Sequence, residues 1–222
     1  MKLDIDKIKA IIFDMDGVIF DTEIVYLKIW SEVFEKYGYQ MTKEIYSSVL
    51  GTGRENVKKV FLKCFGNELP INNMYIEKDE NLAKEIEKGI PLKPGVYEIL
   101  TYLREKDFKI ALATSAISKR AFKQLKQANI ESFFDAVVCR DEVKETKPNP
   151  DIFLKAADKL MLKPEQCIVI EDSSAGIEAA FNAGMVPIHV VDLKEADEKI
   201  LSNSYKSFND LNEIANELMS MK

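Results

Sequence analysis

The sequence is poor in cysteine and histidine, and it has no long apolar run. Its three cysteines, Cys64, Cys139 and Cys167, are odd in number and widely spaced, so we expect buried, unreactive thiols, with a redox pair as the less favoured alternative. The only histidine, His189, ends a late predicted strand, where a structural role is expected. The N-terminal MKLDIDKIKA lacks an apolar signal core, and no run approaches transmembrane length. These absences favour a cytoplasmic protein with no membrane partner.

The charge balance argues against one class of partner. Acidic residues number 37 against 31 basic ones, for a formal net charge of -6. This balance disfavours nonspecific binding to nucleic acid, which is a polyanion. It leaves an anionic small substrate open, because local positive charge decides such binding. The 222 residues, 46% of them hydrophobic, suffice for one large domain or for a domain with a smaller one inserted. We expect a monomer, since no feature of the sequence demands assembly.

The hydrophobic pattern changes once along the chain. From Asp21 to about Gly89 it is helical throughout, with helices predicted over residues 22–38, 42–49, 54–65 and 72–88. From Pro94 helices alternate with strands. The predicted helices span 95–106, 118–128, 150–161 and 175–183, the strands span 109–113, 135–139, 167–171 and 186–191, and a last amphipathic helix covers 209–221.

Alternation of this kind predicts parallel strands joined by right-handed crossovers. The first strand, residues 9–14, has no partner nearby in sequence and must join the later sheet. The predicted fold class is therefore α/β, a Rossmann-like doubly wound parallel sheet with an inserted helical domain. The core would comprise residues 1–17 and 91–222, and the insertion residues 18–90.

Polar side chains stand where the predicted strands end. Asp14 and Asp16 sit at the end of the first strand, and residues two apart on a strand point to the same side. The apolar run of the strand over 167–171 likewise leads into Glu171 and Asp172. In an open parallel sheet these ends converge on the ligand crevice. Two acidic pairs there would make an oxygen-rich pocket suited to Mg²⁺.

Two further segments bring positive charge and hydroxyl groups to the same edge. Thr114 and Ser115 follow the strand over 109–113, and Lys147 precedes a proline-marked helix start. A carboxylate beside Mg²⁺, a fixed lysine and donors for phosphate oxygens are the parts that phosphoryl transfer needs. Each part alone also has a structural explanation: a turn, a helix cap, a surface lysine, or carboxylates favoured by a helix dipole.

The order of these segments resembles the haloacid dehalogenase superfamily. The motifs are FDMDGVIFDTE (13–23), KPNPDIF (147–153) and EDSSAGIEAA (171–180), together with Thr114. The branch resembled contains small phosphatases and β-phosphoglucomutases with a helical cap inserted after the first strand. The resemblance covers essentially the whole chain and implies that residues 18–90 are the cap.

The resemblance also implies roles for the core residues. Asp14 would be the nucleophile that forms an aspartyl-phosphate. Asp16 would protonate the leaving oxygen, then activate water, and lend its carbonyl to Mg²⁺. Lys147 would steady Asp14 and the transferring phosphoryl group, which Thr114, with Ser115 beside it, would bind. The remaining implied metal ligands are Asp172 and Glu171, the latter directly or through water.

In the cap, the resemblance assigns the substrate to a few positions. Thr22 matches the hinge where the cap begins, and LGTGREN (50–56) resembles the substrate loop, with Gly51 and Arg54. Arg54 would reach a distal anionic group of the substrate, and a solvated arginine at a helix start is the alternative. Lys78 lies near a phosphate-binding lysine of the mutases, but in so charged a helix a solvated face is the expected role.

The resemblance leaves the reaction open between hydrolysis and the phosphoryl transfer that a mutase catalyses. The mutases carry a histidine on the first cap helix, and here that position is Tyr26. We therefore favour magnesium-dependent hydrolysis of a small phosphorylated metabolite, a sugar phosphate above all. β-Phosphoglucomutase activity is the second hypothesis. A non-catalytic phospho-acceptor module is a remote third, because such modules are shorter and have no helical insertion.

Overall fold

The computed structural model describes residues 3–50, 53–193 and 196–221. The chain divides into two compact units, one made of Met1–Asp21 and Pro91–Lys222, the other of Thr22–Ile90. Residues 18–20, predicted to begin the insertion, stay with the first unit because Val18, Ile19 and Phe20 are buried there. The backbone N–H of Gly17 also donates to the carbonyl of Phe20, 2.9 Å away.

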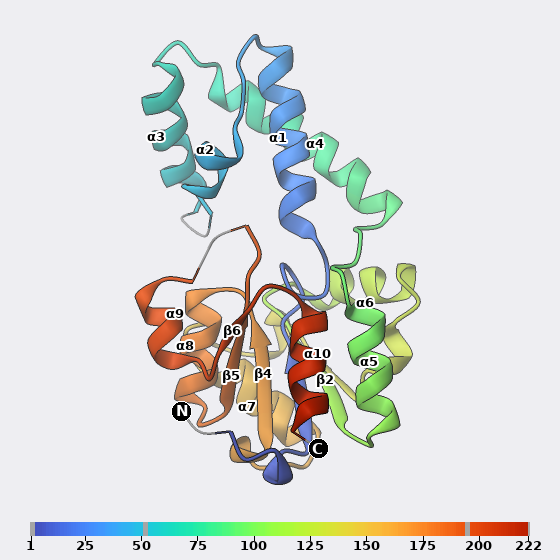
Figure 1. Ribbon diagram of the computed structural model, residues 1–222. Coiled ribbons are helices and arrows are strands. Elements are labelled where there is room, and N and C mark those ends of the chain that lie inside the picture. Colours follow the sequence, from blue (N-terminus) through green and yellow to red (C-terminus); the bar gives the residue numbers. More distant parts are fainter. Residues whose placement is uncertain (1–2, 51–52, 194–195, 222) are drawn as a thin grey trace. The chain divides into compact units, whose positions relative to one another are not determined.

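The first unit is built on one parallel sheet (Figure 1). Its strands in the described residues are β1 (Ala10–Phe13), β2 (Lys109–Ala113), β3 (Ala136–Val138), β4 (Cys167–Glu171), β5 (Val186–Val190) and β6 (Ser207–Phe208). They lie in the order β3-β2-β1-β4-β5-β6, and every pairing is parallel. The predicted α/β doubly wound fold is confirmed. The strand order reverses between β1 and β4, where such sheets bind their ligands.

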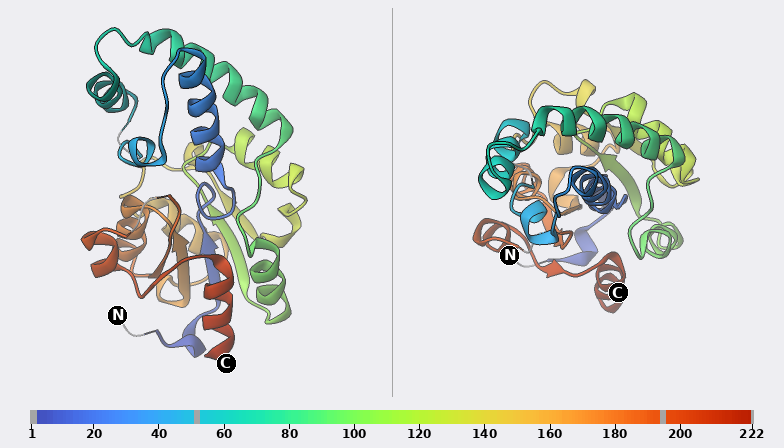
Figure 2. Two further views of the ribbon diagram at one scale, coloured as in Figure 1. Left: turned by 45° about the horizontal axis from the view of Figure 1, so that its top comes forward. Right: turned by 90° about the horizontal axis from the view of Figure 1, so that it is seen from above.

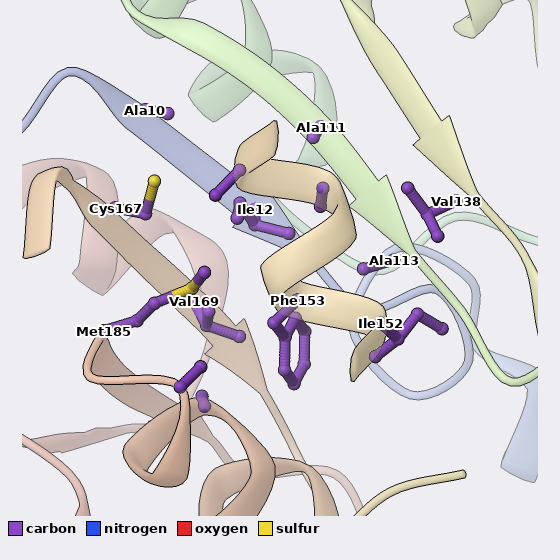
Figure 3. Packing of buried hydrophobic residues seen from close by; sticks show 14 of the residues in the cluster. Ala10, Ile12, Ala111, Ala113, Val138, Ile152, Phe153, Cys167, Val169 and Met185 are labelled. Carbon is purple, nitrogen blue, oxygen red and sulfur yellow. The ribbon is translucent and has the colours of Figure 1, made fainter. Parts of the chain in front are cut away.

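Both faces of the sheet are buried, since β1 to β4 are almost continuously apolar. On one face Ile12 and Val169 pack with Phe153 in a cluster that includes residues of α7 (Asp151–Lys159) and α8 (Ser174–Asn182), as Figure 3 shows. Toward the other face, α5 (Val96–Glu105) contacts β2 and packs against α10 (Leu211–Ser220). The register pairs Phe13 with Leu112 and Ile170, so β2 and β4 each end one residue beyond the end of β1.

Several short elements complete this unit. They are α6 (Ser118–Gln127), α9 (Glu198–Asn203) and the 3-10 helices η1 (Ile5–Lys7), η2 (Glu131–Phe133), η3 (Arg140–Glu142) and η4 (Pro164–Gln166). The expected burial is found for Cys139 and Cys167, whereas Cys64, in the second unit, is exposed, and all three thiols are free. No helix in the described ranges combines the length and apolarity needed to cross a membrane.

Helices are the only regular secondary structure among the described residues of the second unit, as predicted (Figure 2). Its helices are α1 (Thr22–Lys36), α2 (Lys43–Ser47), α3 (Arg54–Phe65) and α4 (Ile71–Lys88). Edge-to-face aromatic contacts hold α1, α3 and α4 together, because the ring of Trp30 lies 5.3 Å from that of Phe61 and 4.9 Å from that of Tyr75. Trp30 is 3% exposed and belongs to the core of this unit.

Candidate active site

The carboxyl end of β1 carries the first predicted acid. The backbone N–H of Asp14 donates to the carbonyl of Ile170 at 3.0 Å, which extends the β1–β4 ladder by one residue. The pairing holds Asp14 at the point where the strand order reverses, and the residue is only 7% exposed. Gly17 follows with a φ of +80°, and a Cβ there would lie 2.5 Å from Oδ2 of Asp172. Only glycine fits, both because of the backbone and because the Asp172 carboxylate fills the space.

Lys147 joins the acids of two strands. Its Nζ donates to Oδ1 of Asp14 and, at 2.8 Å, to Oε1 of Glu171. It lies 4.8 Å from the centroid of the Phe153 ring, and its side chain is 7% exposed. Burial alone would lower the pKa of Lys147, but the charges of Asp14 and Glu171 outweigh burial and raise the pKa above its ordinary value. Lys147 is therefore a permanently charged, buried cation rather than a surface lysine.

Glu171 is fixed by the start of the next helix. Its Oε2 accepts hydrogen bonds from the backbone N–H of Ser173 at 2.6 Å and from the Ser173 hydroxyl at 2.9 Å. The same hydroxyl caps α8 by accepting from the N–H of Gly176 at 3.1 Å. A Cβ at position 176 would lie 1.8 Å from Oε1 of Glu171, so the glycine makes room for the carboxylate. Both oxygens of Glu171 already accept hydrogen bonds, one from Lys147 and one from Ser173.

Three carboxylates converge in this region. Oxygens of Asp14, Glu171 and Asp172 lie within 4.8 Å of one another. Burial, opposed by Lys147 and reinforced by Glu171 and Asp16, raises the pKa of Asp14 to about 7. Burial, together with Glu171 and Asp14, raises the pKa of Asp172 well above its ordinary value. One buried lysine therefore leaves this cluster short of positive charge, and oxygen ligands so arranged suit a hard divalent cation.

Thr114 follows β2 and is 1% exposed. Its backbone N–H donates to the carbonyl of Val138 at 3.0 Å, and its hydroxyl oxygen accepts from the N–H of Ala116 at 3.0 Å. Helix α6 has Ile117 at its N-cap position, with no side chain capping it. The alternative that Thr114 or Ser115 caps this helix is therefore wrong. The Thr114 hydroxyl keeps its hydrogen for another acceptor, while Ser115 is exposed.

The carboxylate of Asp16 is not part of the three-carboxylate cluster. Its Oδ1 accepts a hydrogen bond from an Nη of Arg120, on α6. The two residues are 104 positions apart in sequence, and no local pattern joins them. Arg120 was not predicted as a site residue.

The residues predicted in the second unit are described within that unit. Thr22, the first residue of α1, is 2% exposed. Arg54 begins α3, forms an ion pair with Asp79 at 3.2 Å and lies 4.2 Å from the centroid of the Tyr75 ring. Gly51 lies outside the described residues. These observations leave the roles predicted for the three positions as hypotheses.

The solvated role expected for Lys78 is wrong. The residue is 8% exposed, and its Nζ pairs with Asp79 at 2.6 Å. It also lies 5.3 Å from the centroid of the Tyr26 ring. Lys78 shares a helical face with Met74 and Leu82, which are buried, so the position is set by the helical period rather than by the charged composition.

His189 has the expected structural surroundings. It is fully buried on β5, and its ring nitrogens contact the Ser207 hydroxyl at 2.7 Å and the backbone carbonyl of Asp172 at 3.2 Å. Burial lowers the pKa of His189, so the ring stays neutral near pH 7. It supports the backbone that presents the Asp172 carboxylate.

Comparison with known proteins places this geometry in a family. The profile of the haloacid dehalogenase-like hydrolases matches residues 11–190. A phosphorylated-carbohydrate phosphatase of Thermotoga maritima is 33% identical over 183 residues, which cover 82% of this chain and 85% of that protein. The β-phosphoglucomutase of Bacillus subtilis is 35% identical over 191 residues, which cover 82% of this chain and 83% of that one.

Solved structures agree with the sequence comparison. The crystal structure of a β-phosphoglucomutase from Clostridium difficile superposes with a TM-score of 0.65 at 28% identity, covering 96% of this chain and 99% of the other. The predicted resemblance and the predicted enzyme class, a phosphatase-type enzyme, are thus confirmed at family level. The chain belongs to the haloacid dehalogenase-like hydrolase family.

Proposed function

We propose that this enzyme hydrolyses a small phosphate monoester, a phosphorylated sugar or similar metabolite, with Mg²⁺ and through an aspartyl-phosphate on Asp14. The observation that carries the proposal is the buried Asp14 carboxylate, held by Lys147 within a cluster that is short of positive charge. Such a carboxylate can attack phosphorus once a cation offsets the repulsion between the two anions.

The residues present fit a magnesium ion. Asp14 and Asp172 would supply carboxylate oxygens, Asp16 its backbone carbonyl, and Glu171 a ligand directly or through water. Glu171 is the least available of these, because hydrogen bonds from Lys147 and Ser173 already occupy it. When bound, the ion supplies electrostatic stabilisation of charge on the phosphoryl oxygens. These acids have raised pKa values without it, as expected of ligands that await a cation.

The chain's own residues would then perform two displacements at phosphorus. In the first, an Asp14 oxygen bonds to phosphorus, the bond from phosphorus to the leaving oxygen breaks, and Asp16 gives that oxygen a proton. In the second, Asp16 takes a proton from water, whose oxygen bonds to phosphorus and displaces Asp14. Inorganic phosphate leaves, and both carboxyl groups return to their starting state. Lys147 and the Thr114 hydroxyl would hold the phosphoryl oxygens throughout.

The second unit would serve as a cap over the substrate. Its position in the chain, between β1 and β2, and its helical composition support this role. Thr22 would lie at the hinge, and Gly51 and Arg54 in the loop that meets the substrate. A cap of this kind admits small molecules and excludes polymers, which agrees with the expectation that nucleic acid is not a partner. The monomeric state and the cytoplasmic location predicted from the sequence stay predictions.

Mutase activity on a hexose phosphate is the second candidate function. The relatives include a β-phosphoglucomutase, and the second unit keeps both Arg54 and a buried Lys78. Tyr26 weighs against it, because the mutases have a histidine at that position. A mutase must also exclude water until a second hydroxyl group arrives, whereas a phosphatase admits it. We therefore give hydrolysis preference.

The first experiment measures turnover of p-nitrophenyl phosphate with Mg²⁺. Asp14→Asn should abolish turnover while the circular dichroism spectrum stays that of the wild type. Asp158→Asn is the matched control, because Asp158 is exposed on α7, and it should keep wild-type activity. Retained turnover in Asp14→Asn would eliminate Asp14 as the nucleophile.

The second experiment separates the candidate functions. The enzyme is incubated with β-glucose 1-phosphate, and free phosphate, glucose 6-phosphate and glucose 1,6-bisphosphate are followed. Hydrolysis predicts free phosphate as the main product. Predominant glucose 6-phosphate would overturn the preference for hydrolysis, and a stable phosphorylated protein without repeated turnover would indicate a phospho-acceptor module.

A further inference from the structure

Arg120 stands out among the groups around the site, because it contacts a site residue from outside the predicted motifs. It lies in the first turn of α6, the helix that begins just after the Thr114 loop. An Nη of Arg120 donates to Oδ1 of Asp16. The side chains of Arg120 and Asp16 are 29% and 31% exposed, so the pair lies at the rim of the buried cluster.

Stability does not account for this pair. Partly exposed ion pairs contribute little to folding, because water solvates both charges well. Arg120 also carries a penalty, since its Nε is buried and has no hydrogen-bond partner within the described residues. An arginine held at this place with an unsatisfied donor is better explained by its effect on Asp16.

The charges on either side of Asp16 indicate what that effect is. Lys147 already attracts Asp14 and Glu171, and the acidic cluster would bind a divalent cation. Without a second cation, the Asp16 carboxylate would be drawn toward Lys147 or that ion. It would then compete with Asp14 and could not reach the leaving oxygen. Arg120, on α6, attracts the Asp16 carboxylate away from these charges and so keeps the two aspartates apart.

We propose that Arg120 is a positioning residue that holds the Asp16 carboxylate clear of the acidic cluster, in place for proton transfer. The proposal rests on the proposed function, in which Asp16 is the acid and then the base. Arg120 itself transfers no proton and forms no bond to the substrate.

The proposal predicts a dependence on the leaving group. A sugar alkoxide is a poor leaving group and needs a proton from Asp16 in the first displacement, whereas p-nitrophenolate leaves without one. The second displacement, in which Asp16 activates water, is common to both substrates. Loss of Arg120 should therefore slow both displacements for a sugar phosphate but only the second for p-nitrophenyl phosphate.

The experiment compares Arg120→Ala, Arg120→Lys and Lys119→Ala with the wild type. Lys119 is the matched control, because it is the adjacent cation on α6 and is exposed. For Arg120→Ala we expect kcat to fall by about 10- to 100-fold, a part of the usual effect of acid–base catalysis, with KM changed less than about threefold. With p-nitrophenyl phosphate, a burst of nitrophenolate should precede slow steady-state turnover. Arg120→Lys or added guanidinium should restore part of the rate, and Lys119→Ala should match the wild type.

A double-mutant cycle with Asp16→Asn completes the test. If Arg120 acts through Asp16, removing Arg120 should cost no further activity once Asp16 has been replaced. Unchanged or raised kcat in Arg120→Ala, or a loss confined to KM, would overturn the positioning role and leave the proposed function standing. Full turnover in Asp16→Asn alone would instead refute the proposed function.

Discussion

Asp14→Asn is expected to stabilise the metal-free protein at alkaline pH while it abolishes catalysis. The folded state raises the pKa of Asp14 from 3.8 to about 7, chiefly through burial. A carboxyl group whose pKa is raised by folding binds its proton more tightly in the folded state, so stability falls as pH rises from about 4 to about 7. The pKa of Asp172 is raised as well and adds to this trend.

The size of the effect follows from the pKa shift. Raising this pKa from 3.8 to about 7 lowers the free energy of unfolding by about 4 kcal/mol at pH 8, relative to a group that stays neutral. At pH 5 the loss is about 2 kcal/mol, because Asp14 is then largely protonated in the folded state. For a chain of this length, each kcal/mol shifts the Tm by about 2–4 °C, so Asp14→Asn should raise the Tm by about 8–16 °C at pH 8. The raised pKa of Lys147 contributes stability that is constant at every pH below the ordinary lysine pKa of 10.5, and this stability is lost only as the pH rises above that value.

The assay is thermal unfolding in EDTA and in Mg²⁺, at pH 5 and at pH 8. In EDTA the wild-type Tm should fall from pH 5 to pH 8, and Asp14→Asn should remove much of that fall. Mg²⁺ should raise the wild-type Tm more at pH 8, where the carboxylates are ionised, and should raise that of Asp14→Asn less. Asp158→Asn, an exposed change, should behave as wild type. An EDTA Tm that is the same at both pH values, in wild type and Asp14→Asn alike, would refute the reasoning.

Three further changes test other parts of the structure. Gly17→Ala should lower activity more than about 100-fold and remove the effect of Mg²⁺ on Tm, because the new Cβ meets the Asp172 carboxylate. The control is Gly184→Ala, where φ is also positive but the space around the Cβ is open. It should lose only about 1–2 kcal/mol of stability in a denaturant titration. Thr114→Val should lower kcat/KM by about 10- to 100-fold in steady-state assays, through one lost hydrogen bond to a charged group. Phe61→Ala should destabilise the second unit by about 3–5 kcal/mol, followed by the fluorescence of Trp30, the only tryptophan.

The sheet could be predicted closely from the sequence because its inner strands are buried on both faces. Unbroken apolar runs between polar ends mark β2 and β4, whose predicted bounds, 109–113 and 167–171, are those of the structure. No such signal marks β6, which has two residues, or α9, which has six and buries only Ile200. Neither element was predicted, because so little apolar surface leaves no periodic pattern.

The site shows the same division between local and distant signals. Asp14, Lys147, Glu171 and Asp172 stand at strand ends or helix starts, and parallel topology gathers such positions. The pair of Arg120 with Asp16 could not be predicted, because it depends on how α6 is placed beside the turn that follows β1. No spacing in the sequence indicates that placement. Lys78 departs from the prediction for another reason: the helical period buries it with Met74 and Leu82, although the composition of α4 is highly charged.

The central claim is that Asp14 becomes phosphorylated during turnover. The direct measurement is acid quench of the reaction within milliseconds, reduction with borohydride, and mass spectrometry of the peptide that contains Asp14 and Asp16. Because borohydride converts an aspartyl-phosphate to homoserine, we predict homoserine at position 14 and unmodified aspartate at position 16. Homoserine at position 16, or none at either position under conditions of rapid turnover, would contradict the account.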